Sequence, residues 1–260
     1  MELRFAKWHG TGNDFIVIDD GAATFPVSDD LVQRLCDRHF GIGSDGLILI
    51  QAPREPGTDF HMEFFNPDAS KSFCGNGSRC AFAFWSGLNH AARTARFTAI
   101  DGEHTGTWRD GEVAVSLRDV TLMKRGSQGT DVDFIHNGSP HELVWVDDPA
   151  AVEIMEEGPK RRYAPAHAPG GTNVNFLRVQ DGVVDMRTYE RGVEAETLSC
   201  GTGVVAAALS ALGRGLVQAP VAVRAPGGRL VVEAVLSNGG ASAVQLIGPV
   251  AFVFNGSISI

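Results

Sequence analysis

The chain lacks several features that would place it quickly in a common class. Its 260 residues include only four lysines, none in a recognisable cofactor-site pattern, which disfavours a pyridoxal enzyme: Lys7, Lys71, Lys124 and Lys160. Cationic residues are outnumbered, and a formal net charge of -9 disfavours a nucleic-acid surface. No apolar run approaches the length of a membrane span, and the first residues lack the apolar region of a signal peptide. We therefore expect a cytoplasmic protein that binds neither nucleic acid nor membrane.

Cysteine is also scarce, and its spacing disfavours the common structural uses of thiols. The chain has four: Cys36, Cys74, Cys80 and Cys200. No Cys-x-x-Cys pair occurs, and a chain of this length needs no disulfides in a reducing compartment. We therefore expect neither a metal site nor a disulfide framework. Cys36 and Cys80 lie on apolar helical faces, where burial is the expected role.

Two matching motifs stand out against this background. Cys74-Gly75-Asn76-Gly77 and Cys200-Gly201-Thr202-Gly203 each open an apolar run that is typical of a helix. A cysteine just before a helix lies beside the N–H groups of the first turn and the positive end of the helix dipole, which favour the thiolate and lower the thiol pKa. Two such thiols predict a paired acid and base, one for each face of a substrate. The alternative is a pair of buried structural thiols.

The surroundings of the two motifs repeat as well. Asp101-Gly102 follows Cys74 at the offset at which Gly227-Gly228 follows Cys200, and two β-type runs precede each motif. The β-type runs are 15–19, 47–50, 60–65, 113–117, 174–179 and 183–189, and a further helix is expected at 29–39. Because the helices after the motifs are apolar nearly all round, each must be surrounded. We predict an α/β (α+β) fold of two similar halves, each a curved, mostly antiparallel sheet wrapped around one buried helix.

Glycine after each cysteine leaves the N–H groups of the helix start accessible to an anion such as a carboxylate. A carboxylate held at both helix starts would place its α-carbon between the two sulfur atoms. Asn13 lies in a tight loop before a strand, Asn66 ends a strand and Asn173 leads into one, so each is also typical of an ordinary turn. The Glu190-Arg191 pair suits either a surface ion pair or recognition of an ammonium and a carboxylate.

At these residues the chain resembles the diaminopimelate epimerase family, which are cofactor-independent amino-acid epimerases. The resemblance covers nearly the whole chain and rests on motifs that occur in order: residues 7–15, residues 40–46, Asn66 through residues 74–80, residues 138–141, and residues 189–192 through 200–203. Proline racemases share the paired cysteines, but their first motif resembles Cys-Gly-His-Gly, where this chain has Asn76.

The resemblance implies two pseudo-symmetric domains, residues 1–118 with 250–260 returning to them, and residues 119–249. It implies interconversion of LL- and meso-diaminopimelate, in the pathway to lysine and the bacterial cell wall, with no cofactor and no metal. Cys74 and Cys200 would be the acid/base thiols. The reacting α-carboxylate would meet the backbone N–H groups of Gly75-Asn76 and Gly201-Thr202.

The resemblance also implies how the rest of the substrate is held. Glu190 and the Arg191 backbone would meet the reacting ammonium. The distal end would be selected by side chains from both halves, with His141 behind them: Asn13, Asn66, Asn173 and Arg191. The chain departs from the family pattern at two positions. Gly46 stands where some members have Gln, and Ser139 stands where many have Asn. We expect Ser139 to bind the substrate with a shorter reach.

Three other functions remain open on the sequence. The first is racemisation or epimerisation of another amino acid, of the proline or hydroxyproline type. The second is a thiol hydrolase in which a cysteine works with His141, although a structural role is more typical of that histidine. The third is an amino-acid-binding protein without catalysis. The oligomeric state is also open, with a homodimer as one option.

Overall fold

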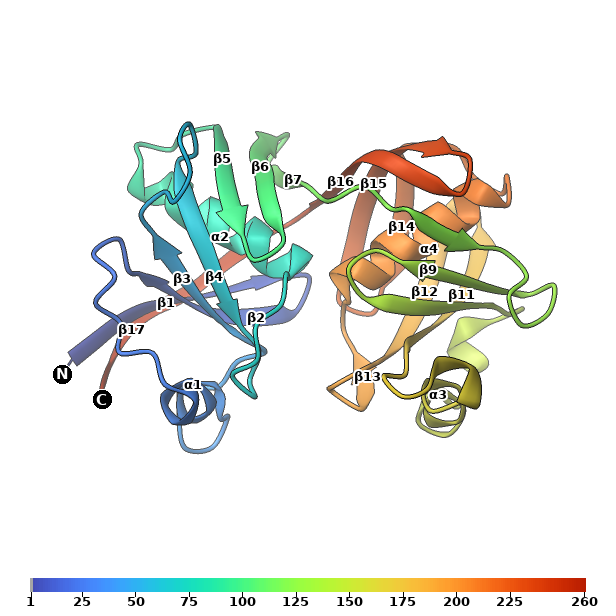
Figure 1. The fold of residues 1–260 in the computed structure, drawn as a ribbon, viewed down its shortest axis with the longest axis horizontal. Helices are drawn as coiled ribbons and strands as arrows, with labels where there is room; N and C mark the ends of the chain where they lie inside the picture. Colours follow the sequence, from blue (N-terminus) through green and yellow to red (C-terminus); the bar gives the residue numbers. More distant parts are fainter. Residues whose placement is uncertain (1) are drawn as a thin grey trace. The chain divides into compact units, whose positions relative to one another are not determined.

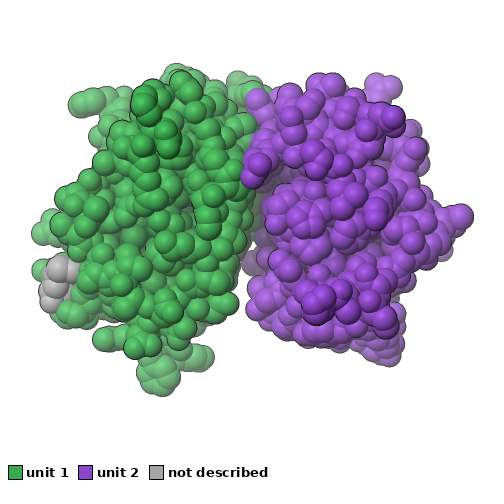
Figure 2. Space-filling model, in the orientation of Figure 1, with its two compact units in different colours: residues 1–116, 248–260 green, residues 117–247 purple. Residues whose placement is uncertain are grey.

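A computed structural model describes residues 2–260, which divide into two compact units. Unit 1 comprises residues 1–116 and 248–260, and unit 2 comprises residues 117–247 (Figure 2). These limits fall two residues from the expected domain boundaries, and the assignment of each unit as an epimerase domain stays a prediction. Within the described range, no helix is both long and apolar enough to cross a membrane.

Unit 1 is a sheet with two helices (Figure 1). Its elements are β1 (Glu2–Gly10), β2 (Asn13–Asp19), α1 (Asp29–Cys36), β3 (Leu47–Gln51), β4 (Phe60–Phe65), α2 (Gly75–Leu88), β5 (Thr94–Ala99), β6 (Gly102–Arg109), β7 (Glu112–Ser116) and β17 (Ala251–Ser259). The strand order is β17-β1-β2-β3-β4-β5-β6-β7. All neighbours are antiparallel except β2/β3 and β4/β5, where α1 and α2 supply the crossovers that parallel pairs require.

Unit 2 follows the same plan. Its elements are β8 (Leu122–Lys124), β9 (Val132–His136), β10 (Pro140–Trp145), η1 (Pro149–Ala151), α3 (Ile154–Arg162), η2 (Pro165–His167), β11 (Asn173–Gln180), β12 (Val183–Glu190), β13 (Ala195–Thr197), α4 (Gly201–Gly213), β14 (Val221–Ala225), β15 (Gly228–Ser237) and β16 (Gly240–Gly248). The order is β8-β9-β10-β11-β12-β14-β15-β16, and β13 also pairs with β12. Again only two pairs are parallel, β10/β11 across α3 and β12/β14 across α4.

The strand directions and helix positions therefore repeat from one unit to the other, and the predicted two similar halves are confirmed. The Asp-Gly turns take the places expected of them. Asp110-Gly111 joins β6 to β7 and Asp181-Gly182 joins β11 to β12, with φ values of 49° and 87°, and 52° and 75°. Positive φ at both central positions is the geometry of the tight hairpin turn that matches strand twist.

The central helices form the cores of the units. Helix α2 packs against each strand from β1 to β7, and α4 packs against β9, β10, β11, β12, β14 and β15. Figure 1 shows each helix among the strands of its own unit. In α4 the side chains from Val204 to Ala211 are all buried, as expected of a helix without a polar face. Cys36 and Cys80 are buried as predicted.

Two helices differ from the sequence-based expectation. The helix predicted at 29–39 ends at Cys36, because the Asp37 carboxylate accepts hydrogen bonds from the N–H groups of His39 and Phe40, both at 2.7 Å, and turns the chain. Helix α3 was not predicted, since it is highly charged and contains Pro159. It packs on β12 through Gly158, where an added Cβ would lie 2.5 Å from the Tyr189 ring.

Candidate active site

Cys74 is the residue that caps α2. Its backbone is extended, with φ -124° and ψ 111°, and its sulfur accepts a hydrogen bond from the Gly77 N–H at 3.3 Å. Space at Gly77 is limited, since an added Cβ would lie 3.3 Å from Ile48 Cδ1 and 3.5 Å from the sulfur. The sulfur is therefore folded back over the helix start, where N–H groups and the helix dipole favour negative charge.

Asn13 and Asn76 lie beside this sulfur. The Asn76 amide donates to Asn13 Oδ1 at 3.2 Å, and Cys74 Sγ lies 3.9 Å from the same oxygen. The Asn13 amide group in turn donates to the Asp45 carboxylate at 2.8 Å. The loop predicted around Asn13 is a two-residue turn between β1 and β2, with Thr11 at φ 53° and Gly12 at φ 83°. Three of the predicted site residues thus meet in unit 1.

A charge cluster, buried at Lys7 and exposed at Arg38, fixes the position of Asn13. The Asp14 carboxylate lies 2.6 Å from the Lys7 ammonium and 2.7 Å from the Arg38 guanidinium, which also contacts Asp45 at 2.7 Å. Burial raises the pKa of Asp14, but the hydrogen bonds from Arg38 and Lys7 outweigh it and lower the pKa to about 2. The Lys7 ammonium also donates to the Gly43 carbonyl, so the cluster ties β1 to the loop before β3.

Asn66 is placed differently from the other predicted residues of unit 1. Its amide donates to the Ser70 carbonyl at 3.1 Å and to the hydroxyls of Ser70 and Ser72 at 3.0 and 3.1 Å, within the loop that leads to Cys74. Gly46, one of the two departures from the family pattern, is tightly packed: an added Cβ would lie 2.5 Å from the Phe64 ring. The surrounding aromatic ring therefore leaves no room for a side chain at that position.

Cys200 caps α4 in unit 2 in a similar extended conformation, with φ -104° and ψ 109°. Its sulfur lies 3.6 Å from the Thr202 hydroxyl, which lies 3.0 Å from His141 Nε2. Gly203 is more tightly enclosed than Gly77. An added Cβ would lie 3.4 Å from the sulfur and 2.8 Å from Asn175 Oδ1.

The hydrogen bonds around His141 define its protonation. The Asn175 amide nitrogen lies 3.2 Å from His141 Nδ1 and also donates to the Glu142 carbonyl, while the Thr188 hydroxyl donates to Asn175 Oδ1. Nδ1 is therefore an acceptor, and Nε2 carries the proton that is donated to Thr202. Burial, with smaller contributions from His136 and Arg191, lowers the pKa of His141 to about 3. The ring is neutral at physiological pH and donates toward Thr202, which disfavours a role as the base of a thiol hydrolase.

A third group of predicted residues lies where β10 and β11 begin. The Asn173 amide donates to the Ser139 hydroxyl and to the Pro140 carbonyl, both at 2.9 Å, and its oxygen accepts the Arg191 N–H at 2.9 Å. The Arg191 side chain itself is exposed. The Glu190 carboxylate accepts the Thr197 hydroxyl at 2.6 Å. Asn173, Ser139 and Arg191 are thus brought together, and Ser139 reaches Asn173 despite its shorter side chain.

The sequence pattern of the family described as diaminopimelate epimerase matches residues 5–122 and 134–253, which include both Cys-Gly-x-Gly motifs. A diaminopimelate epimerase from Flavobacterium psychrophilum is 38% identical over 260 residues, which span 98% of this chain and 100% of the relative. The chain belongs to the diaminopimelate epimerase family. Its relatives are named as diaminopimelate epimerases, which are isomerases that act on an amino acid, and the predicted family is confirmed.

Two solved structures show the same fold at low sequence identity. A phenazine biosynthesis protein of the PhzF family from Bacillus anthracis superposes with a TM-score of 0.76 at 11% identity, covering 100% of both chains. A hydroxyproline epimerase from Agrobacterium vitis, with bound trans-4-hydroxy-L-proline, superposes with a TM-score of 0.72 at 17% identity, covering 100% of this chain and 93% of the other. These similarities confirm the predicted fold class.

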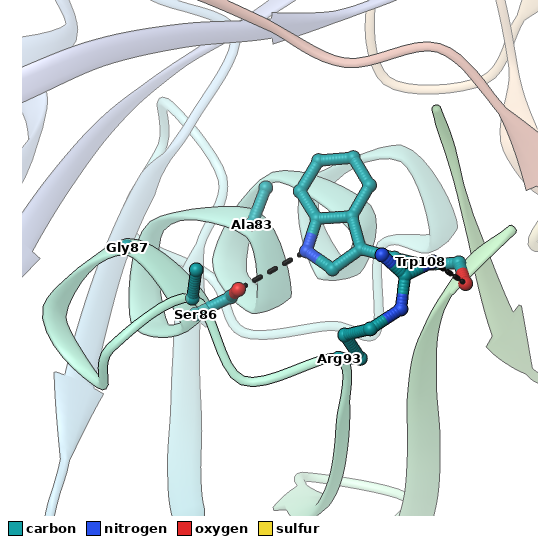
Figure 3. Close-up of a pocket in the computed structure, with 6 residues that line it drawn as sticks. Ala83, Ser86, Gly87, Arg93 and Trp108 are labelled. Carbon is teal, nitrogen blue, oxygen red and sulfur yellow. Dashed lines mark hydrogen bonds between the residues drawn. The ribbon is translucent and has the colours of Figure 1, made fainter. Parts of the chain in front are cut away.

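A pocket lies at the C-terminal end of α2, at the opposite end of that helix from Cys74. It has a volume of about 320 Å³ and is lined by Ala83, Ser86, Gly87, Ala91, Arg93 and Trp108. Figure 3 shows the Trp108 indole N–H donating to the Ser86 hydroxyl, at 3.0 Å. That hydroxyl donates to the Ala92 carbonyl at 2.7 Å. The Trp108 indole and the Ser86 hydroxyl are thus already hydrogen-bonded to protein groups. None of the predicted site residues lines this pocket.

The residues that sequence reasoning missed are those that hold the predicted ones in place. Asp45 fixes Asn13, and Asn175 fixes His141. Asp45 is contained in the family motif of residues 40–46, and Asn175 alternates with Asn173 on β11, so both carried a weak signal. Among residues 2–260, no cluster of His, Cys, Asp and Glu side chains is arranged to hold a metal ion.

Proposed function

We propose that this chain interconverts LL- and meso-2,6-diaminopimelate without a cofactor. One cysteine would take the α-proton from one face of the substrate, and the other would supply a proton to the opposite face. One observation carries this proposal. In a chain of the diaminopimelate epimerase family, each unit has a cysteine at the start of its buried central helix. Inversion of a stereocentre needs a proton acceptor and a proton donor on opposite faces, which a duplicated site supplies.

The helix starts suit the charge that forms during the reaction. The backbone N–H groups of Gly75-Asn76 and Gly201-Thr202 would bind the reacting α-carboxylate, as N–H groups at helix starts bind anions elsewhere. When the α-proton leaves, negative charge spreads onto that carboxylate. Preorganised donors stabilise such charge by about 3 kcal/mol each. The buried surroundings of both helices support this, since electrostatic interactions strengthen where water is excluded.

The remaining polar residues would select the substrate. Glu190 and the Arg191 backbone would hold the reacting ammonium. The distal carboxylate and ammonium would meet Asn13, Asn66, Asn173, Ser139 and the Arg191 side chain. His141 would act behind them by donating its Nε2 proton to the Thr202 hydroxyl, which lies 3.6 Å from the Cys200 sulfur. This set of amides and charges favours a ligand that is polar at both ends over proline or hydroxyproline.

The decisive experiment is exchange of the substrate α-hydrogen in deuterated water, with no cofactor added. We expect label to enter LL- and meso-diaminopimelate while they interconvert, with no exchange into proline. Substrate without label would refute epimerisation, and labelled proline would favour the alternative substrate class. Cleavage of an ester or amide without label would favour the hydrolase.

Cysteine variants test the two-thiol mechanism. Cys74→Ser and Cys200→Ser should each lower turnover by about 100-fold or more, because a hydroxyl is a far weaker acid than a thiol. Cys36→Ser, which alters a buried thiol away from both helix starts, is the control and should keep turnover. Wild-type turnover in either site variant would exclude the mechanism, provided that melting temperatures confirm folding.

Family membership also supports the broader proposals. We propose that the enzyme acts in the cytoplasm, in the pathway to lysine and peptidoglycan, and that it forms a homodimer. Light scattering at micromolar concentration would test the homodimer, and a monomeric mass would refute it.

A further inference from the structure

Arg79 is a buried cation in the first half of α2, beyond Cys74. Its exposed fraction is 0%. The Nη2 atom lies 3.5 Å from the Thr11 hydroxyl, whereas Nε and Nη1 have no hydrogen-bond partner anywhere in residues 2–260. The guanidinium packs against the β1–β2 turn, where a Cβ added at Gly10 would lie 3.0 Å from Nη2. Burial of a cation without an anion is strongly unfavourable, so an anion is expected near it.

The groups around Arg79 narrow the choice of anion. Burial lowers the pKa of Arg79 to about 10, while Cys80, Cys74 and Glu112 act in the opposite direction. Arg79 therefore stays charged at neutral pH. Burial raises the pKa of Cys80 to about 12, so Cys80 is a neutral thiol there. Glu112, on β7, has the smallest influence of the three.

Cys74 is the group that can supply the charge. It is only half-buried, and the Gly77 N–H already donates to its sulfur. The other charged groups at this end of unit 1 form their own cluster: Lys7, Asp14, Arg38 and Asp45. Cys74 caps the same helix that carries Arg79, so we assign its thiolate as the anion that Arg79 stabilises.

The second unit differs at the equivalent position. In the two aligned motifs, Arg79 follows Cys74 as Val205 follows Cys200, and Val205 is buried in the apolar core of unit 2. Cys200 is itself buried, which disfavours its charged form. The histidine linked to it through Thr202 is neutral. The duplicated helices therefore differ in the charge that they place behind their cysteines.

We propose that Arg79 is a positioning residue that holds Cys74 as the resting thiolate and leaves Cys200 as the resting thiol. The inference rests on the proposed function and assigns the two thiols their order of action. At rest, the Cys74 proton has gone to solvent. In turnover, Cys74 takes the α-proton and Cys200 donates its proton to the opposite face. The enzyme then holds a Cys74 thiol and a Cys200 thiolate, and exchange of one proton at each sulfur with water restores the resting form.

The pH dependence of alkylation tests the order of ionisation directly. The full-length enzyme is treated with iodoacetamide across a range of pH, and modification of each cysteine is measured by peptide mass spectrometry. We expect Cys74 to reach half of its maximal rate at a lower pH than Cys200. Equal midpoints, or a lower midpoint for Cys200, would overturn the proposal. No substrate is present, so failure here is distinct from failure of the α-hydrogen exchange that tests the function.

Arg79 variants test the cause. Arg79→Met removes the charge but keeps a side chain of similar length. It should raise the pH midpoint of Cys74 alkylation by about one unit, which corresponds to an about tenfold smaller thiolate fraction below the midpoint. Arg79→Lys retains the charge and should keep the midpoint near that of the wild type. Val205→Met, at the equivalent position of α4, is the matched control and should leave Cys74 unchanged.

The outcomes of the variants are separable from misfolding. An unchanged Cys74 midpoint in folded Arg79→Met would overturn the role of Arg79, as would an Arg79→Lys variant that behaves like Arg79→Met. If circular dichroism shows that Arg79→Met does not fold, the order of midpoints in the wild-type enzyme and the Arg79→Lys midpoint still decide the proposal.

Discussion

The charge cluster behind Asn13 predicts that acid removes a defined part of the stability of the protein. Burial raises the pKa of Asp14, but the bonds from Arg38 and Lys7 outweigh it and bring the pKa from 3.8 to about 2. A depressed carboxyl pKa stabilises the folded state above the unfolded pKa, and this stability is lost as the pH falls through the folded pKa. Asp14 is only 19% exposed, so the shift corresponds to about 2 kcal/mol at pH 7 and about 1 kcal/mol at pH 3.

Urea unfolding of the wild type and of Asp14→Asn between pH 7 and pH 3 tests this. Urea is preferred because guanidinium salts screen ion pairs. The variant should be less stable by about 2 kcal/mol at pH 7, and the difference should shrink toward pH 3. Asp147→Asn is the control, since Asp147 is exposed and forms no ion pair within residues 2–260. A difference between the wild type and Asp14→Asn that stays constant with pH would refute the reasoning.

Three further predictions concern the site. Gly203→Ala should lower kcat/KM for epimerisation by at least about tenfold, because the added Cβ would lie 2.8 Å from Asn175 Oδ1; Gly213→Ala, whose nearest contacts are at 3.8 Å, should not. His141→Gln should weaken the loss of stability on acidification, measured as unfolding free energy. Burial lowers the pKa of His141 from 6.5 to about 3, so between these pH values only the unfolded chain binds a proton at this residue. The wild type therefore loses about 1.4 kcal/mol of unfolding free energy at this residue per pH unit as the pH falls. A pH slope in His141→Gln equal to that of the wild type would contradict this. Under the proposed two-thiol mechanism, mild oxidation should abolish turnover by joining Cys74 to Cys200, with recovery on adding a reductant; turnover that resists oxidants would count against that mechanism.

The parts of the fold that were predictable are those governed by local rules. The Asp-Gly turns, the apolar helices after each motif and the recurring offsets were all visible in the sequence, and they led to the two similar halves. Helix α3 was missed because its stability comes from packing Gly158 against Tyr189 rather than from local propensity. The end of α1 depended on a single Asp37 carboxylate that competes with the helix for backbone N–H groups.

The candidate site shows a similar division. The motifs located both cysteines, because position before a helix is a property of adjacent residues. The partners that orient the site come from distant segments: Asp45 reaches Asn13 from the loop before β3, and Asn175 reaches His141 across neighbouring strands. Arg79 was in view as part of a motif, but only the fold shows that its charge is buried. Such contacts depend on tertiary packing, which one sequence does not specify by pattern.

Strand β17 gives the chain an order of assembly during synthesis. Unit 2 is one continuous segment, residues 117–247, so all of its strands are available once that segment has left the ribosome. Unit 1 is different, because β1 at the start of the chain pairs with β17 at its end. Until the last residues emerge, β1 presents an open edge to other chains. The half made first is thus the half completed last, and a nascent chain that stalls before residue 251 exposes a strand that invites aggregation.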